Sequence, residues 1–110
     1  MTYEEKQLGG GIRNVRIHIP INGSHIIDFG FDVRNAIAFF PKSDEFNDRL
    51  MTLIRNGRLV REGIKFYEGR AYYSRGKFRI QNFQERDTTV LLLEGPNGAP
   101  QKYSIEVAKN

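Results

Sequence analysis

The chain has 110 residues, of which 39% are hydrophobic, and its 17 Lys and Arg against 13 Asp and Glu give a net charge of +4. This length and composition exclude a disordered or collagen-like chain and predict one globular domain with its own core. The absence of cysteine excludes disulfide bonds, thiol nucleophiles and thiolate zinc sites, and it favours a reducing compartment, so we expect a cytoplasmic protein. The apolar runs are too short to span a bilayer, so no membrane segment is expected.

Residues 1–13 are polar for most of their length and contain three consecutive glycines. We interpret this segment as a flexible lead and residues 14–110 as the domain. The domain opens with VRIHIPI, a turn at NGS, and HIIDFGFDV, in which apolar residues occupy every second position. This alternation predicts two strands, each with one buried face, joined as a hairpin.

Residues 43–56, SDEFNDRLMTLIRN, are compatible with two structures. In the first, Ser43 caps a helix whose apolar residues follow at helical spacing. In the second, a loop leads into the strand RLMTLIR, which ends in a hairpin turn at Asn56-Gly57. Local rules do not choose between them. The helix would give an α+β or barrel-like fold, and the strand would give an all-β fold.

After Gly57 every segment has the pattern of a short strand, and glycine-containing turns separate the segments. They are RLVREG, IKFYEG, RAYYSRG, KFRIQNF, TTVLLLEG and QKYSIEVAK. No segment in this region is predicted to be a helix. Regularly spaced short strands favour a β-sandwich or a barrel.

The stretch KFRIQNFQERDTTVLLL resembles the corner between strands E and F in immunoglobulin superfamily domains of the I-set and V-set type. The matching positions are Phe78, Ile80, Phe83, Asp87, Leu91 and Leu93. The resemblance implies that Phe78 and Ile80 point inward from strand E. It also implies that Asp87 pairs with an arginine at the start of strand D, and either Arg70 or Arg75 is suitable.

The resemblance covers about 90 of the 110 residues. LIRNGRLV is similar to the family's W-Y-K-N-G-R-x-L and puts Leu53 at the core Trp position. Phe29 or Phe31 stands where the family has its first Cys, and Leu93 stands at the second. The implied fold is an all-β immunoglobulin-like sandwich without the Cys pair and the Trp, in which Phe29, Leu53 and Leu93 fill the core.

Two further features follow from the same alignment. EGPNGAPQKYSIEV is similar to the hairpin between strands F and G, with Asn97-Gly98 in its turn. Residues 34–48 become an unusually long connection between strands B and C. Because this connection is apolar, we expect it to add a short strand or helix that covers one end of the sandwich.

Basic and aromatic residues alternate in residues 58–77, RLVREGIKFYEGRAYYSRGK. In one interpretation half of the aromatics face the core and the basic residues are solvated. In another the stretch is a protein interface, where Tyr and Arg dominate binding energy. In a third it binds single-stranded nucleic acid by stacking bases and neutralising phosphates. The candidate partner-binding residues are Arg58, Arg61, Lys65, Tyr67, Arg70, Tyr72, Asn97 and Gly98.

The sequence offers no catalytic constellation. His18 and His25 have no converging ligands in the pattern, and no serine lies in a nucleophile elbow. We therefore expect no catalytic residue, no cofactor, no metal and no enzymatic activity. The resemblance implies a protein-protein interaction module that binds through an edge strand or the sheet of strands C, C′, F and G. Intracellular members such as muscle cytoskeletal domains suggest one domain of a larger cytoskeletal or scaffold protein. The alternative is a small basic protein that binds single-stranded nucleic acid.

Overall fold

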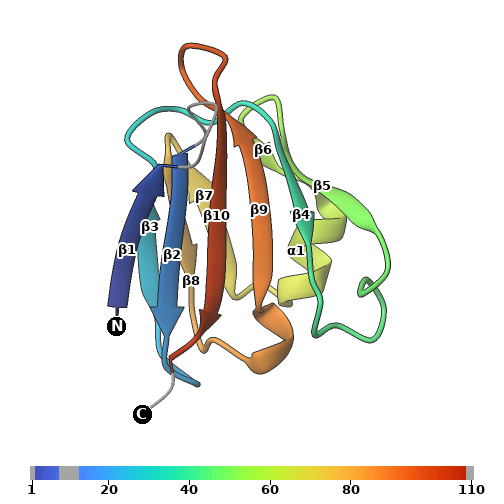
Figure 1. Ribbon diagram of the computed structural model, residues 1–110. Helices are drawn as coiled ribbons and strands as arrows, with labels where there is room; N and C mark the ends of the chain where they lie inside the picture. The colour runs from blue at the N-terminus through green and yellow to red at the C-terminus, as the bar shows by residue number, and fades with distance from the viewer. Residues whose placement is uncertain (1, 8–12, 109–110) are drawn as a thin grey trace.

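The computed structural model describes residues 2–7 and 13–108, which form two β-sheets packed face to face (Figure 1). The larger sheet has the order β1 (Thr2–Gln7), β2 (Arg13–Ile19), β10 (Pro100–Val107), β9 (Thr89–Glu94), β4 (Ala36–Phe39), β5 (Leu50–Arg55) and β6 (Arg58–Leu59). The smaller sheet has the order β3 (His25–Asp28), β8 (Lys77–Ile80) and β7 (Ala71–Ser74). One short helix, α1 (Arg61–Tyr67), and one 3₁₀ turn, η1 (Glu85–Asp87), complete the described part.

The strand order is that of an immunoglobulin-like sandwich of the variable type. β3, β8 and β7 take the places of strands B, E and D, and β10, β9, β4, β5 and β6 take those of G, F, C, C′ and C″. β2 pairs in parallel with β10, and the other ladders are antiparallel. The predicted all-β immunoglobulin-like fold, built without cysteine, is confirmed.

The long connection between strands B and C does not exist as predicted. Residues 36–39 are the strand β4, which pairs with β9 on one side and β5 on the other. The true connection between β3 and β4 is residues 29–35. The prediction aligned LIRNGRLV with strand C, although it forms C′ and C″. The predicted strand assignment was therefore displaced by one hairpin. A short apolar run such as AIAFF has no periodicity that identifies it as a strand.

The predicted hairpin of residues 15–33 is also wrong, because β2 and β3 belong to different sheets. The turn between them is held by the corner after β8. The Asn22 amide donates to the Phe83 carbonyl at 2.7 Å, and the Phe83 amide donates to the Gly23 carbonyl at 2.8 Å. The alternation did identify the buried faces correctly, since Val15, Ile17 and Ile27 are buried.

The predicted flexible lead is in part a strand. Residues 2–7 form β1, which pairs antiparallel with β2 from Thr2 opposite His18 to Gln7 opposite Arg13. β1 thus extends the larger sheet beyond β2, whose other edge is occupied by β10. Residues 8–12, with the three glycines, lie outside the described residues.

The ambiguous residues 43–56 adopt the loop-and-strand structure. β5 runs into β6 through Asn56 and Gly57, whose φ angles of 54° and 79° are both left-handed, as the twist of a two-residue hairpin turn favours. Ser43 keeps the capping role foreseen for a helix, because its Oγ accepts the amides of Glu45 and Phe46 at 3.3 and 3.2 Å. These bonds close a turn whose Phe46 is buried.

Residues 61–67, predicted as strand, form α1. The buried residues of the helix are Gly63, Phe66 and Tyr67, a helical spacing, and the helix ends at Glu68, whose φ is 55°. The Phe66 ring lies 4.2 Å from that of Phe40 between centroids. In Figure 1 the helix lies behind β4 and β5, where the smaller sheet has no strand. Within the described residues, no helix is long and apolar enough to cross a membrane.

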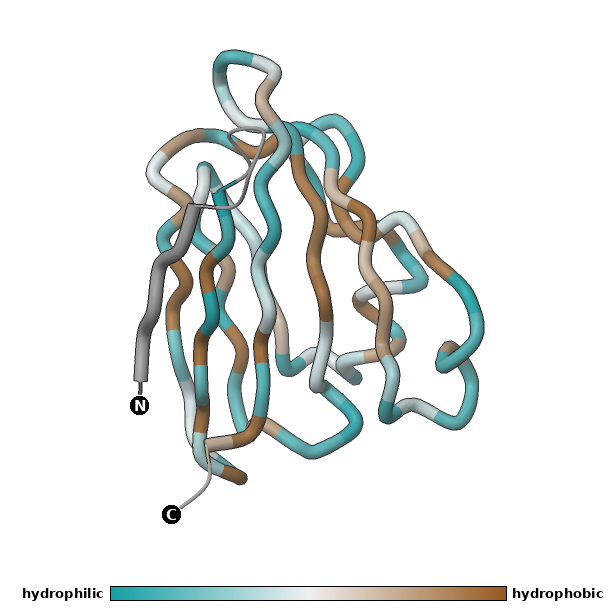
Figure 2. Tube along the Cα trace, viewed as in Figure 1, coloured by the Kyte–Doolittle hydropathy of each residue, from teal (hydrophilic) through white to brown (hydrophobic). Residues whose placement is uncertain are grey.

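The core is one cluster of apolar side chains between the two sheets, extended under β4 and β5 by α1. Figure 2 shows hydrophobic and hydrophilic residues alternating along β2, whereas β9 is hydrophobic along most of its length. One face of β9 supplies Leu91 and Leu93 to the core. The other face of β9 points away from the core and is still apolar.

Candidate protein-binding surface

The corner after strand E is built around Asp87, as the resemblance implied. Asp87 is fully buried and receives two hydrogen bonds from the Arg70 guanidinium, at 2.6 and 3.0 Å. The Gln84 amide donates to the same carboxylate at 2.9 Å. The hydrogen bond to Asp87 is the main cause that raises the pKa of Arg70. The partner is therefore Arg70 and not Arg75, and Arg70 acts inside the fold.

The eight residues predicted to bind a partner do not form one surface. Arg58, Arg61 and Lys65 are exposed on β6 and α1, Tyr72 is 64% exposed on β7 of the smaller sheet, and Asn97 and Gly98 form the tip between β9 and β10. Tyr67 is fully buried, and burial raises the pKa of its hydroxyl. Tyr67 and Arg70 are thus structural residues, because the stretch that contains them folds as a helix and a buried ion pair.

The three residues expected to replace the Cys pair and the Trp are all buried, but Leu53 does not take the Trp position. Phe29 packs edge-on against Tyr103 at 4.9 Å between centroids, and Leu93 lies opposite Ala36 on β4. Leu53 lies on β5, one strand further away. It is the extra residue of a β-bulge, which turns Leu53 and its neighbour Ile54 both inward.

The two histidines do not converge. His18 is on β2 with its Nε2 3.3 Å from Glu106, and His25 is on β3 of the other sheet. Burial lowers the pKa of His25. In the part of the chain that the structure describes, no three His, Asp or Glu side chains are grouped as they would be for a metal ion.

The outer side of the larger sheet carries a continuous apolar area, which we call the apolar face. It consists of Ile37, Phe39, Leu50, Val90 and Leu92. Ile37 lies directly opposite Leu92, while Phe39 lies between Val90 and Leu50. The exposed fractions of Leu50, Ile37 and Leu92 are 61%, 44% and 42%. Because directly opposed side chains on antiparallel strands touch, the five form one area over β9, β4 and β5.

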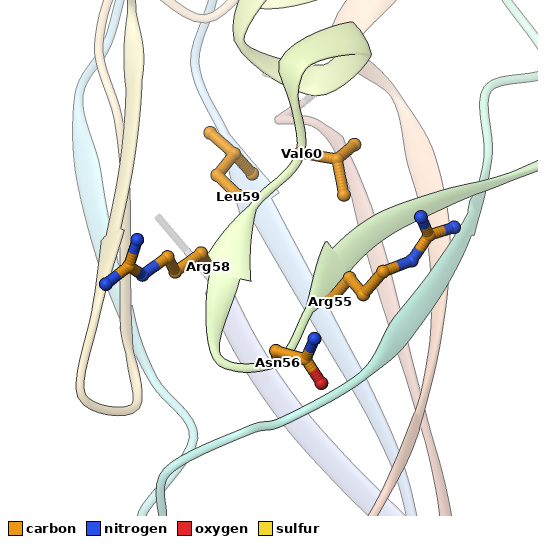
Figure 3. A pocket seen from close by; sticks show the side chains of 5 residues that line it. All are labelled: Arg55, Asn56, Arg58, Leu59 and Val60. Carbon is orange, nitrogen blue, oxygen red and sulfur yellow. The ribbon is translucent and has the colours of Figure 1, made fainter.

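Beside the apolar face, two adjoining hollows follow the β5–β6 edge, and we call them together the arginine groove. The first has a volume of about 520 Å³ and is lined by Arg55, Asn56, Arg58, Leu59 and Val60. Figure 3 shows Arg55 and Arg58 extending in different directions from the two strands of the hairpin. The second, of about 350 Å³, is lined by Arg49, Leu50, Met51, Thr52, Arg55, Val60, Arg61 and Glu62.

The four arginines of the groove are Arg49, Arg55, Arg58 and Arg61. Among residues 13–108, whose side chains the structure describes, none of the four forms an ion pair. Arg49 instead lies over the Phe46 ring, 4.9 Å from its centroid. Their positive charge is therefore available to an anionic partner. Leu50 belongs both to the groove and to the apolar face, so the two surfaces are continuous.

Sequence reasoning identified Arg58 and Arg61 but missed the apolar face and two of the arginines. A signal for the face was present in the unbroken apolar run of residues 90–93, since consecutive apolar residues in an antiparallel strand put apolar side chains on both faces. Arg49 directly precedes β5 and Arg55 is its last residue, and they join the groove only because β6 and α1 fold back beside that strand.

Neither a family model nor a curated protein matches this sequence. Among solved structures, the chain is similar to the first immunoglobulin-like domain of human CD48 antigen, determined in solution, with 12% sequence identity and a TM-score of 0.47. The match covers 94% of this chain and 87% of that one. The immunoglobulin-like arrangement is given by the strand order and pairing of this chain itself.

Proposed function

We propose that the chain is a non-enzymatic protein-interaction module and that it binds a protein partner through the apolar face. The observation that supports this function is the register of five apolar side chains across β9, β4 and β5, three of them more than 40% exposed. Contiguous apolar area on the outside of a sheet is unfavourable in water unless a partner covers it. Covering each of the three would contribute roughly 1 kcal/mol, about half of what full burial of such a side chain gives.

The setting of the module is inferred from composition. A sandwich whose core is filled by Phe29 and Leu93 in place of a disulfide suits a reducing compartment. From this composition we infer a cytoplasmic role. From the resemblance to intracellular immunoglobulin superfamily domains we infer that the chain is one domain of a larger cytoskeletal or scaffold protein.

Binding of single-stranded nucleic acid is the second candidate function, and the four arginines of the groove favour it. Among the described residues, the arginine groove has no exposed aromatic ring on which bases could stack, because Phe66, Tyr67 and Tyr73 are buried. Tyr72 is exposed but lies on the smaller sheet. A protein partner is therefore the better supported of the two.

The test compares capture of proteins from a native lysate by the tagged chain and by Leu92→Asp and Ile37→Asp variants. A charge on the apolar face should abolish capture of the specific partner without changing the circular dichroism spectrum. Ile26→Asp is the matched control, since Ile26 is 51% exposed on the outer side of the smaller sheet. The proposal fails if the variants of the apolar face capture the same proteins as the wild type. Loss of capture after nuclease treatment would favour nucleic-acid binding instead.

A further inference from the structure

The outer edge of β5 is mostly open. β6 pairs only with Ile54 and Arg55, and the Val60 amide donates to the Leu53 carbonyl at 2.9 Å. Residues 50–52 have β4 on one side and, within the described residues, no strand on the other. The hollow of about 350 Å³ runs along this open segment. An unpaired strand edge offers backbone donors and acceptors to another extended chain.

We propose that an extended acidic segment of a protein partner pairs with this edge of β5 as an additional strand. The occupant is acidic because Arg49, Arg55 and Arg61 line the hollow against a single carboxylate, Glu62. Guanidinium groups bind carboxylates in a bidentate manner. Side chains of a strand alternate between its two faces, so acidic residues at every second position would all lie on one face of the added strand.

The lining of the groove favours an acidic peptide over nucleic acid as the occupant. No aromatic side chain lines either hollow, so bases would have no ring on which to stack. Apart from the charged residues, the second hollow is lined by the backbone edge of β5 and by the aliphatic side chains of Leu50 and Val60, which suit a peptide. This site lies at the sheet edge and does not depend on a partner covering the apolar face.

The test uses a blocked synthetic peptide in which Glu alternates with Val, labelled for fluorescence anisotropy and titrated with the full chain. We expect binding that weakens as salt rises, with amide NMR shifts concentrated at residues 50–52. Arg55→Gln and Arg61→Gln should each weaken binding about two- to fivefold, as expected for exposed ion pairs. Arg79→Gln is the matched control, because Arg79 is exposed on the smaller sheet, and it should leave the affinity unchanged.

Two N-methylated versions of the same peptide test whether its backbone pairs with β5. In one version of the peptide the Glu amide nitrogens are methylated and in the other the Val amide nitrogens, so each keeps its charge but loses the hydrogen-bond donors of one strand edge. The version that is methylated on the edge facing β5 should no longer bind. Binding of both methylated peptides as tightly as the parent would overturn edge pairing. No binding of the parent peptide would overturn it too, and the arginines would then protect the edge against self-association. Tighter binding of oligothymidylate than of the peptide would also overturn the proposal. Leu92→Asp should bind the peptide normally, which separates this site from the apolar face.

Discussion

Asp87 shows how one buried side chain can tie together three parts of a small sandwich. It accepts hydrogen bonds from Arg70, just before β7, and from the Gln84 amide, before η1. Arg70 in turn donates to the carbonyls of Gln81 and Asn82 at 3.3 and 3.1 Å. The pair therefore fixes the path from β8 to β9. Because both charges are largely removed from water, each depends on the other for compensation.

Removal of this carboxylate should destabilise the protein strongly. Asp87→Ala leaves the Arg70 charge without its partner, and we expect the free energy of unfolding in urea to fall by about 3 to 5 kcal/mol. Glu68→Gln is the control, because Glu68 pairs with Arg86 at the surface, and its effect should stay below about 1 kcal/mol. Similar losses for the two variants would show that burial does not set the strength of the Asp87 pair.

At the scale of elements, the turn between β7 and β8 is locked against the segment after β3. The Gly76 amide donates to the Tyr73 hydroxyl at 3.0 Å, and the Gly76 carbonyl accepts the Phe29 amide at 2.8 Å. A Cβ on Gly76 would lie 2.3 Å from the Phe31 carbonyl oxygen. The turn can approach so closely only because position 76 has no side chain.

Two glycines with similar backbone angles make this contact testable. Gly76 and Gly69 have φ angles of 85° and 79°, but a Cβ on Gly69 would have no atom within 4 Å. Gly69→Ala should therefore lower the free energy of unfolding by about 1 to 2 kcal/mol, the strain of the left-handed conformation alone. Gly76→Ala should lower it clearly more, because backbone must move. Equal shifts of the two thermal midpoints would contradict the close approach.

At the scale of the whole molecule, the two sheets are unequal. Among the described residues, seven strands face three, and α1 covers the part of the inner surface that the smaller sheet does not reach. Phe66 connects the helix to Phe40, just after β4, and to Phe46 in the following loop, at 4.2 and 5.9 Å between ring centroids. The helix thus belongs to the same core as the strands.

A shared core predicts a single cooperative unfolding transition. Phe66→Ala should lower the free energy of unfolding by about 3 to 5 kcal/mol, and far-ultraviolet dichroism and tyrosine fluorescence should still change together in urea. Ile64→Ala, on the exposed side of the same helix, should have a small effect. A separate early transition seen only by dichroism would show that α1 unfolds independently of the sandwich.

The sequence by itself determined which side of many strands is buried and where several turns lie. Val15 and Ile17 are buried as their alternation predicted, and Phe78 and Ile80 are buried as the resemblance implied. The resemblance of this stretch to the corner between strands E and F was enough to foresee the Asp87 carboxylate and its arginine partner. Period-two alternation follows from local geometry and needs no knowledge of the partner strand.

Only the tertiary structure decided which strands pair, and with that the identity of the candidate sites. Alternation indicates which face of β2 is buried, but it does not indicate whether β2 pairs with β3 or with β10. REGIKFY became a helix because Phe66 and Tyr67 fill the space under β4 and β5, an advantage that depends on residues distant in sequence. For the same reason the apolar face emerges only when β9, β4 and β5 lie side by side. The arginine groove emerges only when β6 and the start of α1 fold back beside β5.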